Sequence, residues 1–268
     1  DSDPAFNGMV NVGGTLDVDA SASEWGMAGQ MNLQNGLVLG DPLEVTGTVR
    51  GHGTVQSDDL TNNGAIEAAG GDLILDTDAV FSSGSTTNID AGLWLIVEGT
   101  ARFDSGCSVT GGGAVEVTND STLCGDGTLD VNIFNDGLVA SYGVLGCEDY
   151  TQWIDGRLQM GVAGTTAGID CDQLDCSGSA TLYGGLEIES GCYNPDYGLE
   201  HEIITAADVA GVFDEISGYE VTEDKWLAVD YKTDQVVLVT AVPADANLDG
   251  AVNLLDLGIM ADHWGENR

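Results

Sequence analysis

Short runs of alternating apolar and polar residues, separated by glycine, constrain the fold of this chain more than any other feature. Examples are GTLDVDA at 14–20, NNGAIEAAGGDLILD at 62–76 and DGRLQMGV at 155–162. An alternation of period two is typical of strands that bury one face, and glycine tolerates the positive φ of tight corners. Because no segment before residue 240 shows ten residues of helical period, we expect an all-β body.

Two architectures use such a string of strands. An antiparallel sandwich or barrel folds back at every turn, whereas a right-handed parallel β-helix coils into stacked rungs of roughly 20–25 residues. Irregular strand spacing and the Asn-Asn-Gly and Asn-Asp-Gly corners at 62–64 and 135–137 favour the coil. We predict a right-handed parallel β-helix (solenoid) over 1–196, a β-rich C-terminal cap over 197–241 and a short calcium-loop and helix tail over 242–268. A β-sandwich is the alternative.

Six cysteines, an even number, lie in the middle of the chain. None belongs to a Cys-x-x-Cys pair and the three histidines are distant in sequence, so we do not expect a zinc site. Cys124, Cys147 and Cys171 are separated by 23 and 24 residues, close to one rung, and stacked residues about 4.8 Å apart are within disulfide reach. We expect disulfides, with the pairing open and buried free thiols as the alternative. The candidates are Cys107, Cys124, Cys147, Cys171, Cys176 and Cys192.

The charge balance excludes several classes of partner. The chain carries 45 Asp and Glu against 6 Lys and Arg, a formal net charge of −39. Nucleic acid and anionic membranes both require a basic surface, so neither is expected to bind. No apolar run approaches the roughly 18 residues that cross a bilayer, so membrane insertion is not expected. Carboxylates are hard oxygen ligands, and they suit a divalent cation such as Ca²⁺.

The stretch DANLDGAVNLLD at 245–256 has the ligand spacing of an EF-hand calcium loop. Its six ligand positions are filled by Asp245, Asn247, Asp249, the carbonyl of Ala251, Asn253 and Asp256. Gly250 stands at the sharp turn, and Pro243 precludes a regular helix before the loop. We therefore predict a Ca²⁺ site, followed by a short amphipathic helix that presents Leu254, Leu255 and Ile259 to a partner.

Two parts of the chain resemble known families. The segment YTQWIDGRLQMGVAGTTAGIDCDQLDCSGSATLYGGLEIE at 150–189 is similar to the last rungs of autotransporter-type bacterial surface β-helices. That resemblance implies the fold and a secreted or cell-surface setting, but no activity. The loop and helix resemble a single dockerin type I repeat, like the C-terminal tags of planctomycete-type secreted proteins. Dockerins bind cohesin modules through two repeats, whereas this chain carries one.

An enzyme is the competing interpretation, because β-helices include polysaccharide lyases and glycosidases. Lyases of that kind need a basic residue, and the six Lys and Arg are scattered along the chain. Among 45 acids, no carboxylate pair of a glycosidase stands out. The five tryptophans occur singly, which is more typical of core or cap residues than of residues that stack on sugars.

The sequence thus predicts a non-catalytic structural or adhesive protein, secreted or on the cell surface. We expect it to be a subunit of an extracellular assembly or filament with calcium-dependent C-terminal attachment. The expected partners are other copies, joined end to end, or a cohesin-like or cell-surface anchoring module, with polysaccharide as a further candidate. The chain begins without Met, as expected after removal of a signal peptide. The alternative is a dockerin-tagged polysaccharide lyase or glycosidase.

Overall fold

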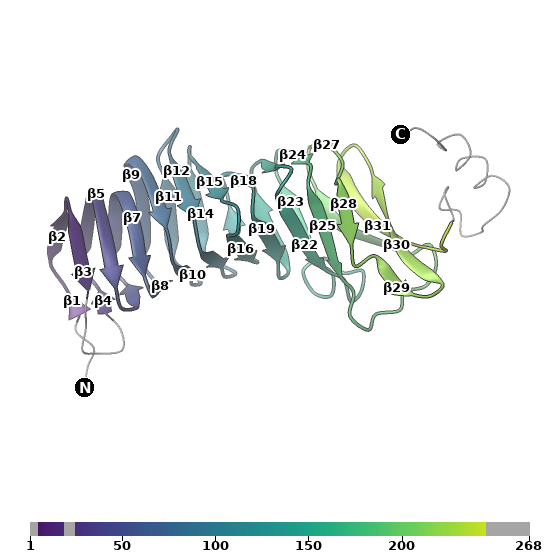
Figure 1. Ribbon diagram of the computed structural model, residues 1–268, viewed down its shortest axis with the longest axis horizontal. Helices are drawn as coiled ribbons and strands as arrows, with labels where there is room; N and C mark the ends of the chain where they lie inside the picture. Colours follow the sequence, from purple (N-terminus) through teal and green to yellow (C-terminus); the bar gives the residue numbers. More distant parts are fainter. Residues whose placement is uncertain (1–4, 19–24, 245–268) are drawn as a thin grey trace.

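The computed structural model describes residues 5–18 and 25–244, and every regular element within these ranges is a β-strand. The chain coils into an elongated rod in which each turn contributes a strand to each of three parallel ladders (Figure 1). The predicted all-β fold and parallel β-helix are confirmed. A sandwich of hairpins is excluded because successive rungs pair in parallel. In the described ranges there is no helix that could cross a membrane.

The first ladder, face A, is a continuous parallel sheet of eleven strands. Its strands are β1 (Ala5–Phe6), β4 (Trp25–Met27), β6 (Leu43–Val45), β8 (Asp59–Asn62), β10 (Asp78–Phe81), β13 (Thr100–Phe103), β16 (Thr122–Gly125), β19 (Leu138–Ser141), β22 (Arg157–Gly161), β25 (Gly185–Glu189) and β28 (Glu215–Ser217). Register partners on this face are as close in sequence as Leu123 and Val139, or as distant as Gly185 and Glu215. The rungs therefore differ greatly in length.

The other two ladders form faces B and C. Three long strands near the N-terminus run through both faces: β5 (Gln30–Gly40), β7 (Thr48–Ser57) and β9 (Ala65–Leu75). The remaining strands of face B are β2 (Met9–Val12), β11 (Thr86–Ile89), β14 (Ser108–Gly111), β17 (Thr128–Leu129), β20 (Val144–Cys147), β23 (Gln173–Cys176) and β26 (Glu200–Thr205). Those of face C are β3 (Thr15–Val18), β12 (Trp94–Val97), β15 (Ala114–Val117), β18 (Asn132–Asn135), β21 (Tyr150–Gln152), β24 (Ser179–Leu182) and β27 (Asp208–Gly211).

The interior is filled by rows of apolar side chains that continue from rung to rung. On face A one such row consists of Leu60, Ala79, Ala101, Leu123, Val139, Leu158 and Leu186, all buried. Phe81 and Phe103 stack with their ring centroids 4.3 Å apart. Full burial of a large apolar side chain stabilises a fold by about 1.5–3 kcal/mol, so these rows hold the rungs together.

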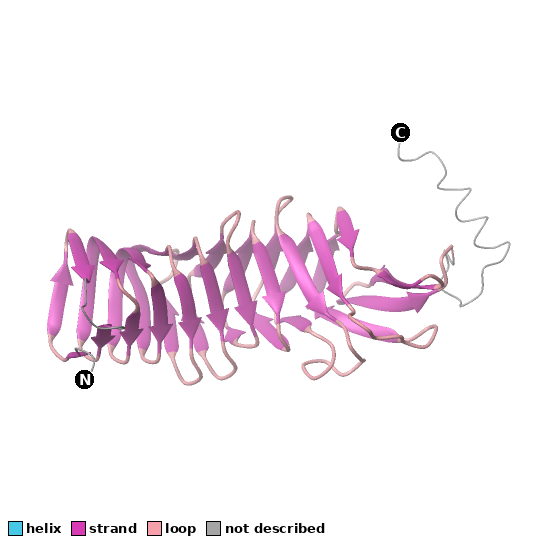
Figure 2. Ribbon diagram, turned by 60° about the horizontal axis from the view of Figure 1, so that its bottom comes forward, coloured by secondary structure: helices cyan, strands magenta, loops and turns pink. Residues whose placement is uncertain are grey.

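The C-terminal end is closed by antiparallel strands (Figure 2). Strand β31 (Gln235–Ala241) pairs with β26 and with β30 (Lys225–Tyr231), which pairs in turn with β29 (Glu220–Thr222). Parallel pairing continues through β28, so the coil extends beyond the expected boundary at residue 196. The reason is that 190–199 is a loop within a long rung, although its irregular sequence resembles the end of a domain.

Candidate functional site

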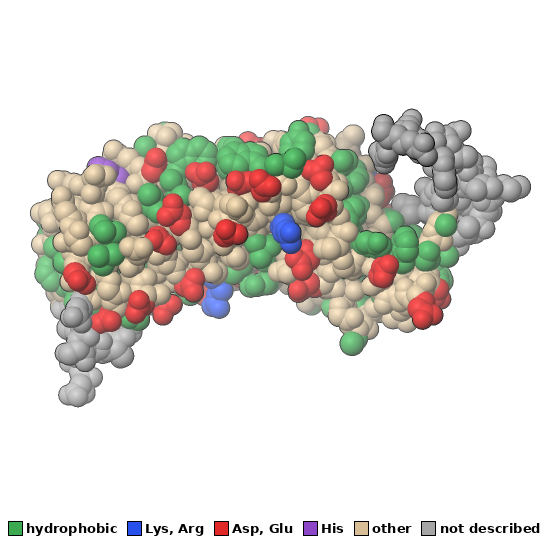
Figure 3. All heavy atoms as spheres, viewed as in Figure 1, with side chains coloured by type: hydrophobic (Ala, Val, Ile, Leu, Met, Phe, Trp, Pro, Cys, Tyr) green, Lys and Arg blue, Asp and Glu red, His purple; other side chains and the backbone are tan. Residues whose placement is uncertain are grey.

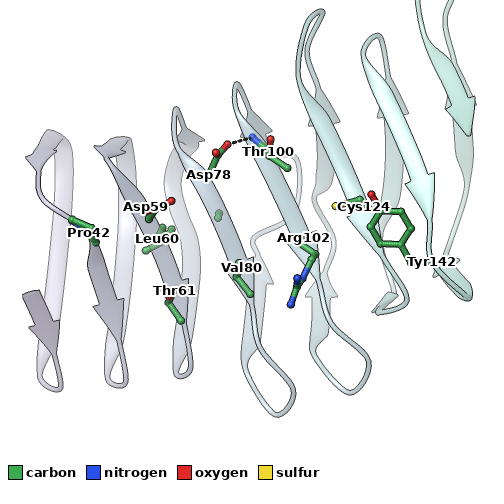
Figure 4. Close-up of a pocket in the computed structure, with 11 residues that line it drawn as sticks. Pro42, Asp59, Leu60, Thr61, Asp78, Val80, Thr100, Arg102, Cys124 and Tyr142 are labelled. Carbon is green, nitrogen blue, oxygen red and sulfur yellow. Dashed lines mark hydrogen bonds between the residues drawn. The ribbon is translucent and has the colours of Figure 1, made fainter. Parts of the chain in front are cut away.

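A groove of about 630 Å³ crosses the outer surface of face A, as Figure 4 shows. Alternate residues of each strand point to solvent, so neighbouring rungs line the groove with outward side chains. Asp59, Asp78 and Arg102 are its charged members, and Tyr142 closes one end. Carboxylates, a guanidinium and a phenol in one groove are the groups that a polysaccharide-cleaving enzyme would use.

Arg102 and Asp78 already have partners within the chain. The Nε of Arg102 donates to Asp104 Oδ1 at 2.8 Å, and this hydrogen bond and the carboxylate charge raise the pKa of the Arg102 guanidinium. Asp78 Oδ1 accepts a hydrogen bond from the Thr100 backbone N–H at 3.2 Å (Figure 4). A guanidinium stabilised in this way stays protonated, so Arg102 is unsuited to act as the base of a lyase.

Asp59 and Asp78 are register partners on β8 and β10, which places their backbones about 4.8 Å apart. Retaining glycosidases hold their two carboxyl groups about 5–5.5 Å apart, so this pair is the best candidate for such chemistry in the groove. Both side chains are exposed, however. The general acid of a glycosidase usually lies in an apolar pocket that favours its protonated form, and neither aspartate has that environment.

Cys124 faces outward between Arg102 and Ala140, its register partners, yet it is buried. Tyr142 covers it and hydrogen-bonds with its thiol, while Tyr142 itself remains 60% exposed. Burial raises the pKa of the Cys124 thiol above its usual value. The neutral thiol is a weak nucleophile, so Cys124 is unsuited to act as a reactive centre.

The structure holds all six cysteines as thiols. The stacking expected for Cys124 with Cys147, and for Cys147 with Cys171, is wrong. Cys124 lies on face A, whereas Cys147 lies on face B. Cys171 lies at the end of a loop that follows β22, where its backbone forms an isolated β-bridge with Val162. The register partner of Cys147 is Cys176, and their Sγ atoms are 3.3 Å apart in the core.

The remaining candidate cysteines have no such partner in register. Burial raises the pKa of Cys107 to about 11 and that of Cys171 to about 12, whereas Cys192 is exposed. The structure therefore narrows the disulfide prediction to one pair of neighbouring thiols, Cys147 and Cys176.

A buried polar network joins the turns between faces C and A, and the sequence analysis missed it. Tyr150 is fully buried, accepts a hydrogen bond from Asn135 Nδ2 at 2.9 Å and donates one to Gln152 Oε1 at 2.7 Å. Burial raises the pKa of Tyr150 well above its usual value. The amide Nε2 of Gln152 lies 3.1, 2.6 and 2.9 Å from the carbonyl oxygens of Gly156, Tyr183 and Gly185. The network thereby fixes the turns on two successive rungs.

His201 is buried beneath the antiparallel cap. Its Nδ1 lies 3.2 Å from the Leu238 carbonyl oxygen and its Nε2 lies 3.1 Å from the Tyr193 hydroxyl. A carbonyl oxygen only accepts, so Nδ1 carries the proton and Nε2 accepts from Tyr193. Burial lowers the pKa of His201, and the neutral ring connects β26 to β31.

The predicted calcium ligands and the apolar residues of the following helix lie outside the described residues. These are Asp245, Asn247, Asp249, Ala251, Asn253, Asp256, Leu254, Leu255 and Ile259. Within residues 5–18 and 25–244, no group of three or more His, Cys, Asp or Glu is arranged to hold a metal ion. The Ca²⁺ site therefore stays a prediction.

No protein-family model matches the chain, and no curated protein matches its sequence.

Proposed function

We propose that this protein is a non-catalytic structural and adhesive component of an extracellular or cell-surface assembly, attached through its C-terminal segment in the presence of Ca²⁺. The observation that carries the proposal is the unbroken stacking of face A, where eleven strands form one parallel sheet along the rod (Figure 1). Each rung is hydrogen-bonded to its neighbours, and solenoids of this kind present extended binding surfaces. A rigid spacer with open sides suits an adhesive component.

The groove on face A also supports a structural role. Its arginine is paired with Asp104, its cysteine is covered by Tyr142, and its aspartates are open to solvent. The second candidate function is a glycosidase acting in this groove, which the register of Asp59 and Asp78 favours. These two functions differ in whether a polysaccharide is shortened.

A cleavage assay separates them. The full chain is incubated with a panel of neutral and acidic polysaccharides, and polymer length is followed by size-exclusion chromatography with light scattering. We expect no shortening. Cleavage that is lost in Asp59→Asn and Asp78→Asn, but kept in the neighbouring exposed control Asp58→Asn, would overturn the non-catalytic function and support the glycosidase.

Calcium-dependent attachment is tested by sedimentation of the wild type and Asp249→Ala, each with Ca²⁺ and with a chelator. Ca²⁺ bound at the predicted ligands would lower self-repulsion in a chain with a net charge of −39, so only the wild type with Ca²⁺ should form larger species. The same sample should protect its C-terminal segment from proteolysis. Identical behaviour of all four samples would contradict calcium-dependent attachment.

A further inference from the structure

A row of exposed apolar side chains follows the corner between faces C and A. Trp153 and Tyr183 come directly after β21 and β24 at equivalent positions, because Thr151 and Thr181 are register partners. Val212 continues the row on the next rung, since Leu182 pairs with Gly211. These three side chains are 40%, 48% and 52% exposed. Large apolar groups are thus repeated on the outside of successive rungs, where polar residues are usual.

Two half-buried aromatic rings on face C, those of Phe134 and Trp94, extend this row toward the N-terminus. The ring centroid of Phe134 lies 6.2 Å from that of Trp153 and 5.0 Å from that of Trp94. Figure 3 shows hydrophobic side chains gathered in a band along the upper edge of the rod, over β12, β15, β18 and β24. We call Trp94, Phe134, Trp153 and Tyr183 the aromatic row. Between Trp94 and Trp153 the row crosses face C obliquely, so a ligand lying on it would cross several rungs.

A groove lies beside the aromatic row. It consists of three adjoining hollows of about 530, 480 and 310 Å³, and Arg157 lines all three. The first residues of five successive face A strands contribute to it: Thr122, Leu138, Arg157, Gly185 and Glu215. These residues are register partners in sequence, so the groove follows the rod over four rung steps, about 19 Å at 4.8 Å per step. We call it the corner groove.

The corner groove contains hydrogen-bonding groups of both kinds. Arg157 is exposed, and none of the ion pairs found in the described residues involves it. A Cβ at Gly185 would lie only 3.3 Å from the Arg157 side chain, so this glycine leaves room for the arginine stem. Asp155 and Glu215 line the same space as carboxylate acceptors. The groove therefore offers both donors and acceptors beside flat apolar rings.

We propose that the corner groove and the aromatic row together bind a neutral polysaccharide. This inference rests on the proposed adhesive function and names its partner. Aromatic faces match the apolar faces of sugar rings, while Arg157 and the carboxylates are suited to bind sugar hydroxyl groups. A groove that crosses five strands suits a linear polymer better than a compact ligand.

Charge excludes the anionic class of polymer. A chain with a net charge of −39, and with Asp155, Asp214 and Glu215 in the groove, repels a polyuronate. The aromatic row distinguishes the remaining classes, because its flat apolar rings match the apolar faces of uncharged sugar rings.

Affinity gel electrophoresis of the full chain tests the proposal, with hydroxyethyl cellulose, galactomannan or xylan in the gel and polygalacturonate as the anionic comparison. We expect retardation by at least one neutral polymer and none by polygalacturonate. The double variant Trp153→Ala/Tyr183→Ala and the single variant Arg157→Gln should each bind at least tenfold more weakly. Tyr197→Ala, which removes an exposed aromatic ring in a loop before the cap, is the matched control and should bind like the wild type.

Several outcomes would overturn the inference: no retardation by any neutral polymer, retardation by polygalacturonate alone, or unchanged binding by the aromatic double variant. Concentration-dependent self-association that disappears in that variant, without glycan binding, would assign the surface to a second copy of the chain and also overturn it. Failure to bind glycan with calcium-dependent assembly intact rejects this inference alone. Binding accompanied by shortening of the polymer would support the glycan site and reject the non-catalytic function.

Discussion

The corner between faces B and C in the N-terminal rungs and the corner between faces C and A farther along the coil turn the chain in different ways. In β7 the strand passes from face B to face C on glycine: Gly51 has φ +128°, and a Cβ there would collide with the carbonyl oxygen of Leu33. In β18 and β21 the corner is instead held by the buried side chains of Asn135 and Gln152. A glycine corner needs only backbone freedom, whereas a side-chain corner fixes the turns that follow it. The second kind positions Trp153 and Tyr183 on the surface.

The largest effect should come from removing the side-chain corner. We expect Gln152→Ala to lower the free energy of unfolding by about 3–5 kcal/mol, because it leaves a cavity and deprives the Tyr150 hydroxyl of its acceptor. Urea unfolding followed by circular dichroism measures this change. Gln159→Ala, which removes an exposed amide bonded to Glu189, should change it by about 0.5 kcal/mol or less. Equal effects of the two substitutions would show that the network does not hold the corner.

A disulfide between Cys147 and Cys176 would increase the difference in stability between the two halves of the coil, because both thiols lie in the C-terminal half. Oxidation of Cys147 and Cys176 by glutathione disulfide during refolding transfers two electrons and two protons, and yields one protein disulfide and two reduced glutathione molecules. The two residues are 29 apart in sequence, and a loop of that size is worth about 3–4 kcal/mol in the chain-entropy model. The hydrogen bond between the thiols and their burial both raise the pKa of Cys147, so oxidation should be slow once the chain has folded.

Mass spectrometry of an unreduced digest should find the Cys147–Cys176 peptide, and the oxidised protein should unfold at higher urea concentration. Cys147→Ser should be insensitive to the oxidant in this assay. Six titratable thiols after oxidative refolding would contradict the pairing.

Substitution at the glycine corner should have a smaller effect. Gly51→Ala places a Cβ against the backbone of the previous rung and forces alanine to positive φ, which should destabilise the fold by about 2–3 kcal/mol. Gly13 meets no atom within 4 Å, so Gly13→Ala is the matched control and should be neutral or slightly stabilising. Urea unfolding of both variants measures the difference, and a neutral Gly51→Ala would show that the corner tolerates a side chain.

The smallest effect should be a pH dependence of the cap. Burial lowers the pKa of His201 below its ordinary 6.5, so the unfolded chain binds a proton more readily than the folded one. The resulting stability is fully present above pH 6.5 and is lost as the pH falls through the folded pKa. The difference in unfolding free energy between the wild type and His201→Gln should therefore shrink from about pH 7.5 to about pH 5.5. A constant difference would mean that His201 binds protons equally in the folded and the unfolded chain.

The sequence by itself determined the fold class and the direction of the side chains. Period-two alternation with glycine corners predicted the parallel β-helix, because a strand that buries one face needs an apolar residue at every second position. The register between the rungs of a solenoid does not follow from this alternation, because it depends on the lengths of the loops. Longer surface loops cost little free energy, so loop lengths vary. Rungs vary from the short step between Leu123 and Val139 to the long one between Gly185 and Glu215.

Because rung lengths vary, only the tertiary structure decided which residues of successive rungs become neighbours. Sequence spacing suggested Cys171 as a partner for Cys147, but the excursion after β22 places Cys176 there instead. The local sequences around Trp153 and Tyr183 have in common only an aromatic residue before a turn. The register between rungs makes these two residues neighbours on the surface. In the sequence, Gln152 is likewise only a polar residue in a strand. The stacking of the rungs buries its side chain against the turns of the next rung. Contacts between rungs are long-range, so residues distant in sequence become neighbours only when the chain has coiled.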